Sequence, residues 1–130
     1  MTSFNNGNGN VMTFKVCRTD KLAALNINVL TGDGKSLAVS LGRDEISHLL
    51  LVLRGMEETV KDGRGVNVVG GFVAFTHVIE PEPGYIMTVK TSDGLANFIF
   101  KYEDAQAFSL LLYLESAFRL VCFDRDELGK

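Results

Sequence analysis

Residues 35–41 of the chain read KSLAVSL, and residues 42–47 continue GRDEIS. In the first stretch apolar residues alternate with small or polar ones, which is the pattern of a strand with one buried face. Asp44 and Glu45 then open an apolar-striped run that continues to Val60, as expected for a helix that covers the strand. This junction of strand and helix predicts an α+β fold.

The same junction recurs sixty-one residues later in the chain. Residues 95–102 (LANFIFKY) alternate again and lead through Glu103 and Asp104 into an apolar run that ends at Phe123. On this offset Leu37, Val39 and Leu41 align with Phe98, Phe100 and Tyr102. Because a repeat of this length usually marks duplication of one supersecondary unit, we expect two pseudo-repeated units of antiparallel strands, each closed by one helix. The units span about residues 11–62 and 66–123 and form a single domain.

The remaining elements follow from local patterns. Residues 1–10 (MTSFNNGNGN) are rich in Asn and Gly and predict a disordered tail, and residues 124–130 predict an acidic C-terminal tail. Gly32-Asp33-Gly34 and Ser92-Asp93-Gly94 predict hairpin turns, because these residue types tolerate positive φ. Alternation predicts further strands at residues 11–19, 22–31, 66–69, 72–79 and 85–91, and helical spacing predicts helices at about 44–61 and 104–122.

Length and composition restrict the class of protein. The 130 residues suit one domain with a hydrophobic core. No apolar run reaches membrane-spanning length, because Arg54 and Glu115 interrupt the two best candidates, and a secretory signal is not expected. Cys17 and Cys122 lie far apart without metal-ligand spacing, so we expect a reduced, cytoplasmic protein.

No pattern in the sequence predicts catalysis. His48 and His77 are the only histidines, and neither has further ligands at metal spacing. Acidic pairs such as Glu57 and Glu58 lie at helix ends and turns, where solvation explains them. We therefore expect a protein that is not an enzyme, with no catalytic residue, no metal and no cofactor.

Charge is distributed unevenly along the chain, whose net charge is −3. Residues 11–43 sum to +3, residues 44–62 to −3, residues 63–101 to zero and residues 102–130 to −3. The predicted strands are therefore neutral to basic and the predicted helices acidic. A sheet face of such a molecule can attract a polyanion although the whole protein is acidic.

Basic and aromatic residues interleave on the predicted strands. Lysines can neutralise phosphates while aromatic rings stack on bases, so this combination is typical of surfaces that bind single-stranded nucleic acid. The alternative for the rings is packing in the core beneath the helices. The residues concerned are Lys15, Arg18, Lys90 and Lys101, with Phe14, Phe75, Tyr85, Phe100 and Tyr102.

Residues 34–49 (GKSLAVSLGRDEISHL) resemble the strand-to-helix segment of the positive cofactor four family of single-stranded-DNA-binding transcriptional coactivators. In that family a lysine-bearing hairpin leads into a short strand, here Val39-Ser40-Leu41, and an acidic residue opens a helix, here Glu45. Two such units in one chain resemble the Whirly proteins. The chain departs from the family in having no tryptophan and an Asn/Gly-rich rather than basic N-terminal segment.

The resemblance implies binding of single-stranded DNA across the sheets, with little sequence preference. It implies a role in replication, recombination or transcription for a bacterial or phage protein, located in the cytoplasm or at the nucleoid. The choice between DNA and RNA stays open. The positions carried over are Lys15, Arg18, Lys35, Lys90 and Lys101 as phosphate contacts, and Phe14, Phe75 and Tyr85 as stacking residues.

Both predicted helices carry more apolar residues than one buried face requires. Leu51 and Val52 lie off the main stripe of the first helix, and Leu112, Tyr113 and Leu120 lie off that of the second. Excess apolar surface requires a partner, so we expect a homo-oligomer joined through helices. The alternative is a protein-interaction or assembly module that uses these helices and binds no nucleic acid. A third possibility, a small-molecule-binding domain or enzyme, would need a convergent polar cluster that the sequence does not show.

Overall fold

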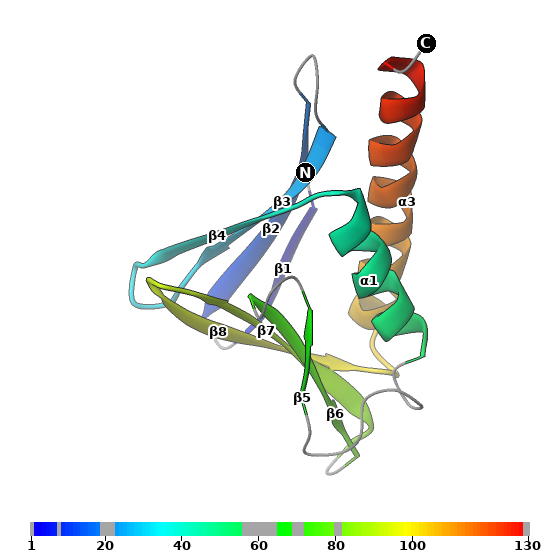
Figure 1. Cartoon of the computed structure of the whole chain (residues 1–130). Coiled ribbons are helices and arrows are strands. Elements are labelled where there is room, and N and C mark those ends of the chain that lie inside the picture. The colour runs from blue at the N-terminus through cyan, green and yellow to red at the C-terminus, as the bar shows by residue number, and fades with distance from the viewer. Residues whose placement is uncertain are drawn as a thin grey trace.

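A computed structural model describes residues 2–7, 9–18, 23–55, 65–68, 72–79 and 82–128 of the chain. These residues form a single α+β domain with two antiparallel sheets and two helices (Figure 1). Neither helix in this part of the chain is long and apolar enough to cross a membrane.

Each sheet is a four-stranded antiparallel meander that is followed by a helix. The first sheet has the order β1-β2-β3-β4, and the second has the order β5-β6-β7-β8. In the first unit these elements are β1 (Thr2–Gly7), β2 (Asn10–Arg18), β3 (Ala23–Leu30), β4 (Ser36–Leu41) and α1 (Arg43–Arg54). In the second they are β5 (Gly65–Val68), β6 (Val73–Val78), β7 (Gly84–Thr91), β8 (Gly94–Lys101) and α3 (Ala105–Leu128).

Alternation along the strands divides each sheet into a buried and an outer face. In β4 the side chains of Leu37, Val39 and Leu41 are buried, while Ser36, Ala38 and Ser40 are exposed. In β8 Phe98 and Phe100 are buried in the same way, whereas Tyr102 follows the strand and is half-buried. The prediction that these apolar positions form the core is confirmed for both strands.

The two sheets converge at the turns β3–β4 and β7–β8 and diverge toward the helices (Figure 1). Helices α1 and α3 pack against each other on the side where the sheets diverge, and α3 contacts β2, β3 and β8. Strands β1 and β8 also contact each other. The ring of Phe4 lies 5.6 Å from that of Phe14 and 5.7 Å from that of Phe100, so a single aromatic core joins the two sheets.

The prediction of a disordered tail at residues 1–10 is wrong, because β1 occupies part of this segment. Thr2 pairs with Phe14 and Phe4 with Met12, and the ring of Phe4 is buried in the core. One buried ring and a paired backbone outweigh the Asn and Gly composition. The register of β1 with β2 shifts between Phe4 and Gly7.

The two helices depart from their predicted boundaries, whereas the strands of the second sheet agree with theirs. Helix α3 continues to Leu128, through most of the predicted acidic tail at residues 124–130. Helix α1 ends at Arg54 with Gly55 as its C-cap, earlier than the predicted end at about residue 61, and residues 56–61 lie outside the described residues. The predicted strands of the second sheet agree with β5 to β8 within one or two residues.

Candidate functional site

The three aromatic residues predicted to stack on bases lie in the core. Phe14 and Phe75 are 0% exposed and Tyr85 is 4% exposed, so none of these rings offers a face to a ligand. Each shares its face of the strand with other buried side chains, such as Met12 beside Phe14 on β2. The stacking prediction is therefore wrong for all three, and the alternative of core packing holds.

Tyr85 lies at the centre of a cluster of aromatic rings. Its ring stacks on Phe100 at 5.1 Å and 17°, meets Phe75 edge-on at 5.8 Å and lies 6.2 Å from Tyr102. Its hydroxyl is buried without a hydrogen-bond partner among the described residues. Burial, with a smaller contribution from Tyr102, raises the pKa of Tyr85 far above that of a solvated phenol.

Lys15 projects from the outer face of the first sheet. In the register of β2, β3 and β4 it lies in a row with Asn26 and Ser40, and Thr13 lies in the next row with Asn28. No described side chain on this face is a carboxylate. The polar side chains of the face include those of Ser3, Thr13, Lys15, Asn26, Asn28, Ser36 and Ser40, and Asn26 donates to Cys17 Sγ on the same face.

Lys90 and Lys101 belong to the second sheet. Lys101 Nζ lies 3.2 Å from a carboxylate oxygen of Glu82, whereas Lys90 is exposed and forms no salt bridge with a described residue. The outer face between them includes the exposed apolar side chains of Leu95 and Ile99. The outer face of the first sheet likewise includes exposed apolar side chains, those of Val11 and Leu30.

Lys35 lies at the end of the molecule where the two hairpin turns meet. The turn is closed by Thr31, whose backbone N–H donates to the Lys35 carbonyl at 2.8 Å and whose hydroxyl accepts the Lys35 N–H at 2.8 Å. A Cβ atom on Gly94, in the second hairpin turn, would lie 3.8 Å from Lys35 Cδ. The Thr31 hydroxyl also donates to the carboxylate of Asp33, and this bond, with help from Lys35, lowers the pKa of Asp33.

The structure therefore divides the predicted phosphate contacts. Lys35 and Lys90 lie toward the end where the turns meet, and Lys15 lies on the outer face of the first sheet. Lys101 lies at the other end of β8, roughly 20 Å away at the usual strand rise, and is already paired. Arg18 ends β2, opposite Ala23, and its side chain lies outside the described part of the structure.

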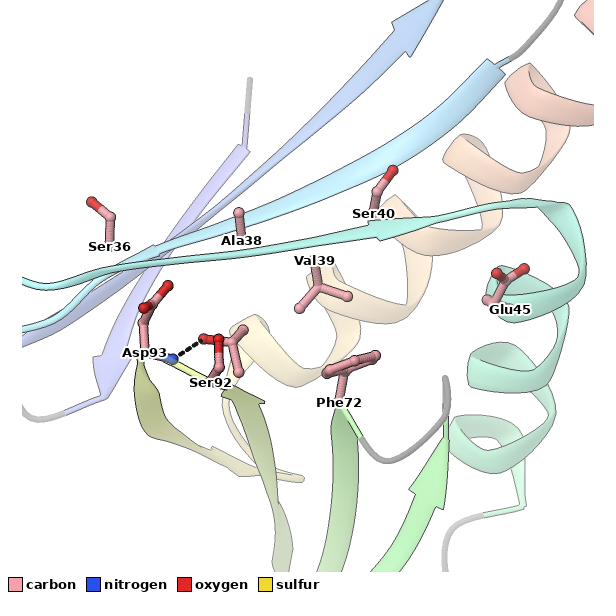
Figure 2. Close-up of a pocket in the computed structure, with 9 residues that line it drawn as sticks. Ser36, Ala38, Val39, Ser40, Glu45, Phe72, Ser92 and Asp93 are labelled. Atoms are coloured by element: carbon pink, nitrogen blue, oxygen red, sulfur yellow. Dashed lines mark hydrogen bonds between the residues drawn. The ribbon is translucent and has the colours of Figure 1, made fainter.

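A groove of about 810 Å³ runs between β4 and the turn β7–β8 (Figure 2). Val39 points from β4 toward Phe72 and Ser92 on the opposite side, while Ser36, Ala38 and Ser40 project to the other face of β4 (Figure 2). Glu45 of α1 and Asp93 of the turn are the two charged residues of its lining. Sequence analysis missed this groove, because its walls come from elements that are distant in the chain.

No protein-family model matches the chain, and no curated protein matches it. Within the described ranges, no three His, Cys, Asp or Glu side chains are placed to hold a metal ion. The site must therefore be interpreted from its own geometry and charge.

Proposed function

We propose that the protein binds single-stranded DNA, largely independently of sequence, through the outer face of the first sheet and the adjoining hairpin turns. The observation that carries the proposal is the absence of carboxylates among the described residues of that face, in a molecule whose net charge is −3. Lys15 projects from a surface of amide and hydroxyl groups that suit phosphate and sugar oxygens.

Among the predicted phosphate contacts, Lys15, Lys35 and Lys90 are available to phosphates. All three are exposed, and none forms a salt bridge with a described residue. Because the predicted stacking rings are buried, affinity depends mainly on phosphate contacts. Three such contacts on a single strand predict a slope of about −2 for log K against log salt.

The order of the elements supports this function through the family resemblance. Four antiparallel strands followed by a helix occur twice, which is the arrangement expected of two positive cofactor four-like units in one Whirly-like chain. Roles in replication, recombination or transcription, and a location in the cytoplasm or at the nucleoid, follow from the resemblance as parts of the same proposal.

Exposed apolar residues on the helices support assembly into a homo-oligomer. Leu51 on α1 is 64% exposed and Phe108 on α3 is 63% exposed, and Leu112 and Leu120 extend the exposed stripe of α3 at helical spacing. A second copy would bury these side chains. Leu112→Glu should therefore lower the molar mass measured by light scattering, while Gln106→Glu, at an exposed position of the same helix outside the row of Phe108, Leu112 and Leu120, serves as the control for added charge.

The proposal can be tested by fluorescence anisotropy with a labelled thymidine strand of roughly 30 nucleotides, a uridine strand and a duplex of the same length. The single strand should bind more tightly than the duplex, and its affinity should fall roughly twentyfold between about 50 and 200 mM salt. Absence of binding at the lower salt would overturn the proposal. Tighter binding of uridine would assign the site to RNA.

A protein-interaction or assembly module is the second candidate function. The exposed helix stripe favours it, because such a stripe fits another protein as well as a second copy. This function predicts a stable complex with a different protein and no affinity for oligonucleotides. The same titration therefore separates the two candidates.

A further inference from the structure

The free edge of β4 exposes backbone hydrogen-bonding groups. β4 pairs with β3 on one side, and no described strand pairs with it on the other. The Thr31 N–H donates to the Lys35 carbonyl, and bonded pairs alternate along an antiparallel ladder. The bonded pairs of β4 are therefore those of Leu37, Val39 and Leu41 with β3. It follows that the N–H and C=O groups of Ser36, Ala38 and Ser40 point to the free edge.

This edge lacks the features that usually protect an edge strand. Native edges carry bulges, charges or proline, or are very short. The pairing of β1 is irregular, β5 has four residues and β8 contacts β1. In contrast, β4 is six residues long with regular pairing and contains neither a charged residue nor proline. An unprotected edge of this kind is suited to accept another strand.

The groove beside this edge has the shape and polarity for an extended chain. β4 lines the groove at Ser36, Ala38 and Ser40, whose small side chains project to the opposite face from Val39 and leave the backbone accessible. Val39 and the exposed ring of Phe72 give the groove an apolar surface. A strand added here would place every second side chain against that surface, because side chains alternate between the two faces.

Charge identifies the kind of chain that fits. The charged residues lining the groove are Glu45 and Asp93, and both are acidic. A nucleic-acid backbone would be repelled here, whereas a segment with lysine or arginine near its ends would be attracted. The groove lining is thus acidic, in contrast to the outer face of the first sheet, where Lys15 lies.

We propose that β4 accepts an extended segment of a partner protein by strand addition, with apolar residues at alternate positions and a basic residue near its end. The backbone groups of Ser36, Ala38 and Ser40 would supply the hydrogen bonds, and Glu45 and Asp93 would select the basic flank. This proposal goes beyond DNA binding, and its test needs no oligonucleotide.

Amide hydrogen exchange of the full chain gives a direct test. The probe is the capped synthetic peptide KVTVTVK at millimolar concentration. The N–H groups of Ser36, Ala38 and Ser40 should become protected on its addition, while those of Leu37 and Val39, already bonded to β3, should not change. Unchanged exchange at all three residues would overturn the proposal. Protection that rises with protein concentration without peptide would also overturn it, because a second copy would then occupy the edge.

Altered peptides and variants test the two parts of the recognition. N-methylation of the peptide amides that face β4 should abolish the protection of Ser36, Ala38 and Ser40. N-methylation of the alternate amides, which face away from β4, should leave the protection unchanged. Ala38→Pro removes an N–H that β3 does not use, so the variant should fold and bind at least about tenfold more weakly. If this variant fails to fold, the methylated peptides still decide between the outcomes.

The charge requirement has a matched control. The double variant Glu45→Gln and Asp93→Asn should weaken binding of KVTVTVK about two- to fivefold, the range expected of exposed ion pairs. Glu103→Gln removes an exposed carboxylate outside the groove and should leave binding unchanged. Equal binding of KVTVTVK and EVTVTVE would contradict the basic flank.

Discussion

Arg54 of α1 and Glu115 of α3 are joined across the helix pair. The Nε and Nη2 atoms of Arg54 donate to one carboxylate oxygen of Glu115 at 3.2 and 3.0 Å. The two residues are 61 positions apart, which is the offset that relates the two strand-to-helix junctions. The contact therefore joins α1 and α3 at positions that follow the two strand-to-helix junctions at the same distance along the chain.

The coupling between Arg54 and Glu115 should be small. Their side chains are 54% and 30% exposed, so water and salt screen the pair. A double-mutant cycle with Arg54→Ala and Glu115→Gln should give a coupling of about 0.2–1 kcal/mol in urea unfolding, and less at high salt. A coupling that does not respond to salt would contradict this account.

Replacement of Lys15, Lys35 and Lys90, which form no salt bridge with a described residue, should remove most of the DNA affinity. In the triple variant Lys15→Ala, Lys35→Ala and Lys90→Ala, the slope of log K against log salt concentration should become less steep, changing from about −2 toward zero. Lys101→Ala is the matched control, because Glu82 already neutralises this lysine. The anisotropy titration measures both, with circular dichroism to verify folding. Equal losses in the two variants would contradict the division of the lysines.

Tyr85→Phe should leave the protein equally stable or more stable. The Tyr85 hydroxyl is buried and unbonded among the described residues, so its removal relieves a desolvation cost of about 1 kcal/mol or more. Tyr85→Leu, which removes the aromatic contacts as well, should destabilise by about 1–3 kcal/mol. Urea unfolding at neutral pH compares the two. A large destabilisation by Tyr85→Phe would show that the hydroxyl has a partner.

The same residue makes stability depend on alkaline pH. Because the pKa of Tyr85 is raised in the folded state, the unfolded chain loses this proton first. The free energy of unfolding should therefore decrease as pH rises past about 10, the ordinary pKa of tyrosine. Tyr85→Phe should show a smaller decrease over that range. Equal slopes for the two proteins would contradict the raised pKa.

Gly84 begins β7 at a position where a side chain does not fit. A Cβ atom there would lie 2.2 Å from the Phe100 carbonyl oxygen and 2.9 Å from Lys101 Cα, and both are backbone atoms. Gly84→Ala should therefore lower the free energy of unfolding by about 1–3 kcal/mol or more. Gly32→Ala, where the nearest atom lies at 3.5 Å, should cost less in the same assay.

Local patterns were sufficient to predict most of the fold. The alternation in β3, β4, β7 and β8 reports one buried face directly, and the glycines of the two hairpin turns fulfil their expected role. Gly34 has φ of +92° and Gly94 has φ of +157°, values that other residues rarely adopt. β1 was missed because composition averages over residues, and the single ring of Phe4 decides its position.

The candidate site was harder to predict, because it depends on which way each side chain points. Phe14 and Lys15 are neighbours in sequence, yet one is buried and the other exposed. The prediction from sequence placed both residues in the nucleic-acid-binding surface. The groove depends on Phe72, Val39 and Asp93 coming together from distant parts of the chain, and no local spacing records that.

The contact of β1 with β8 also determines when the molecule can be completed during synthesis. Phe100, the neighbour of Phe4 in the core, is synthesised ninety-six residues after it. Contacts so distant in sequence raise the contact order and slow folding. β1 must therefore wait for β8, and during that interval Phe4 is exposed to chaperones, proteases and other nascent chains.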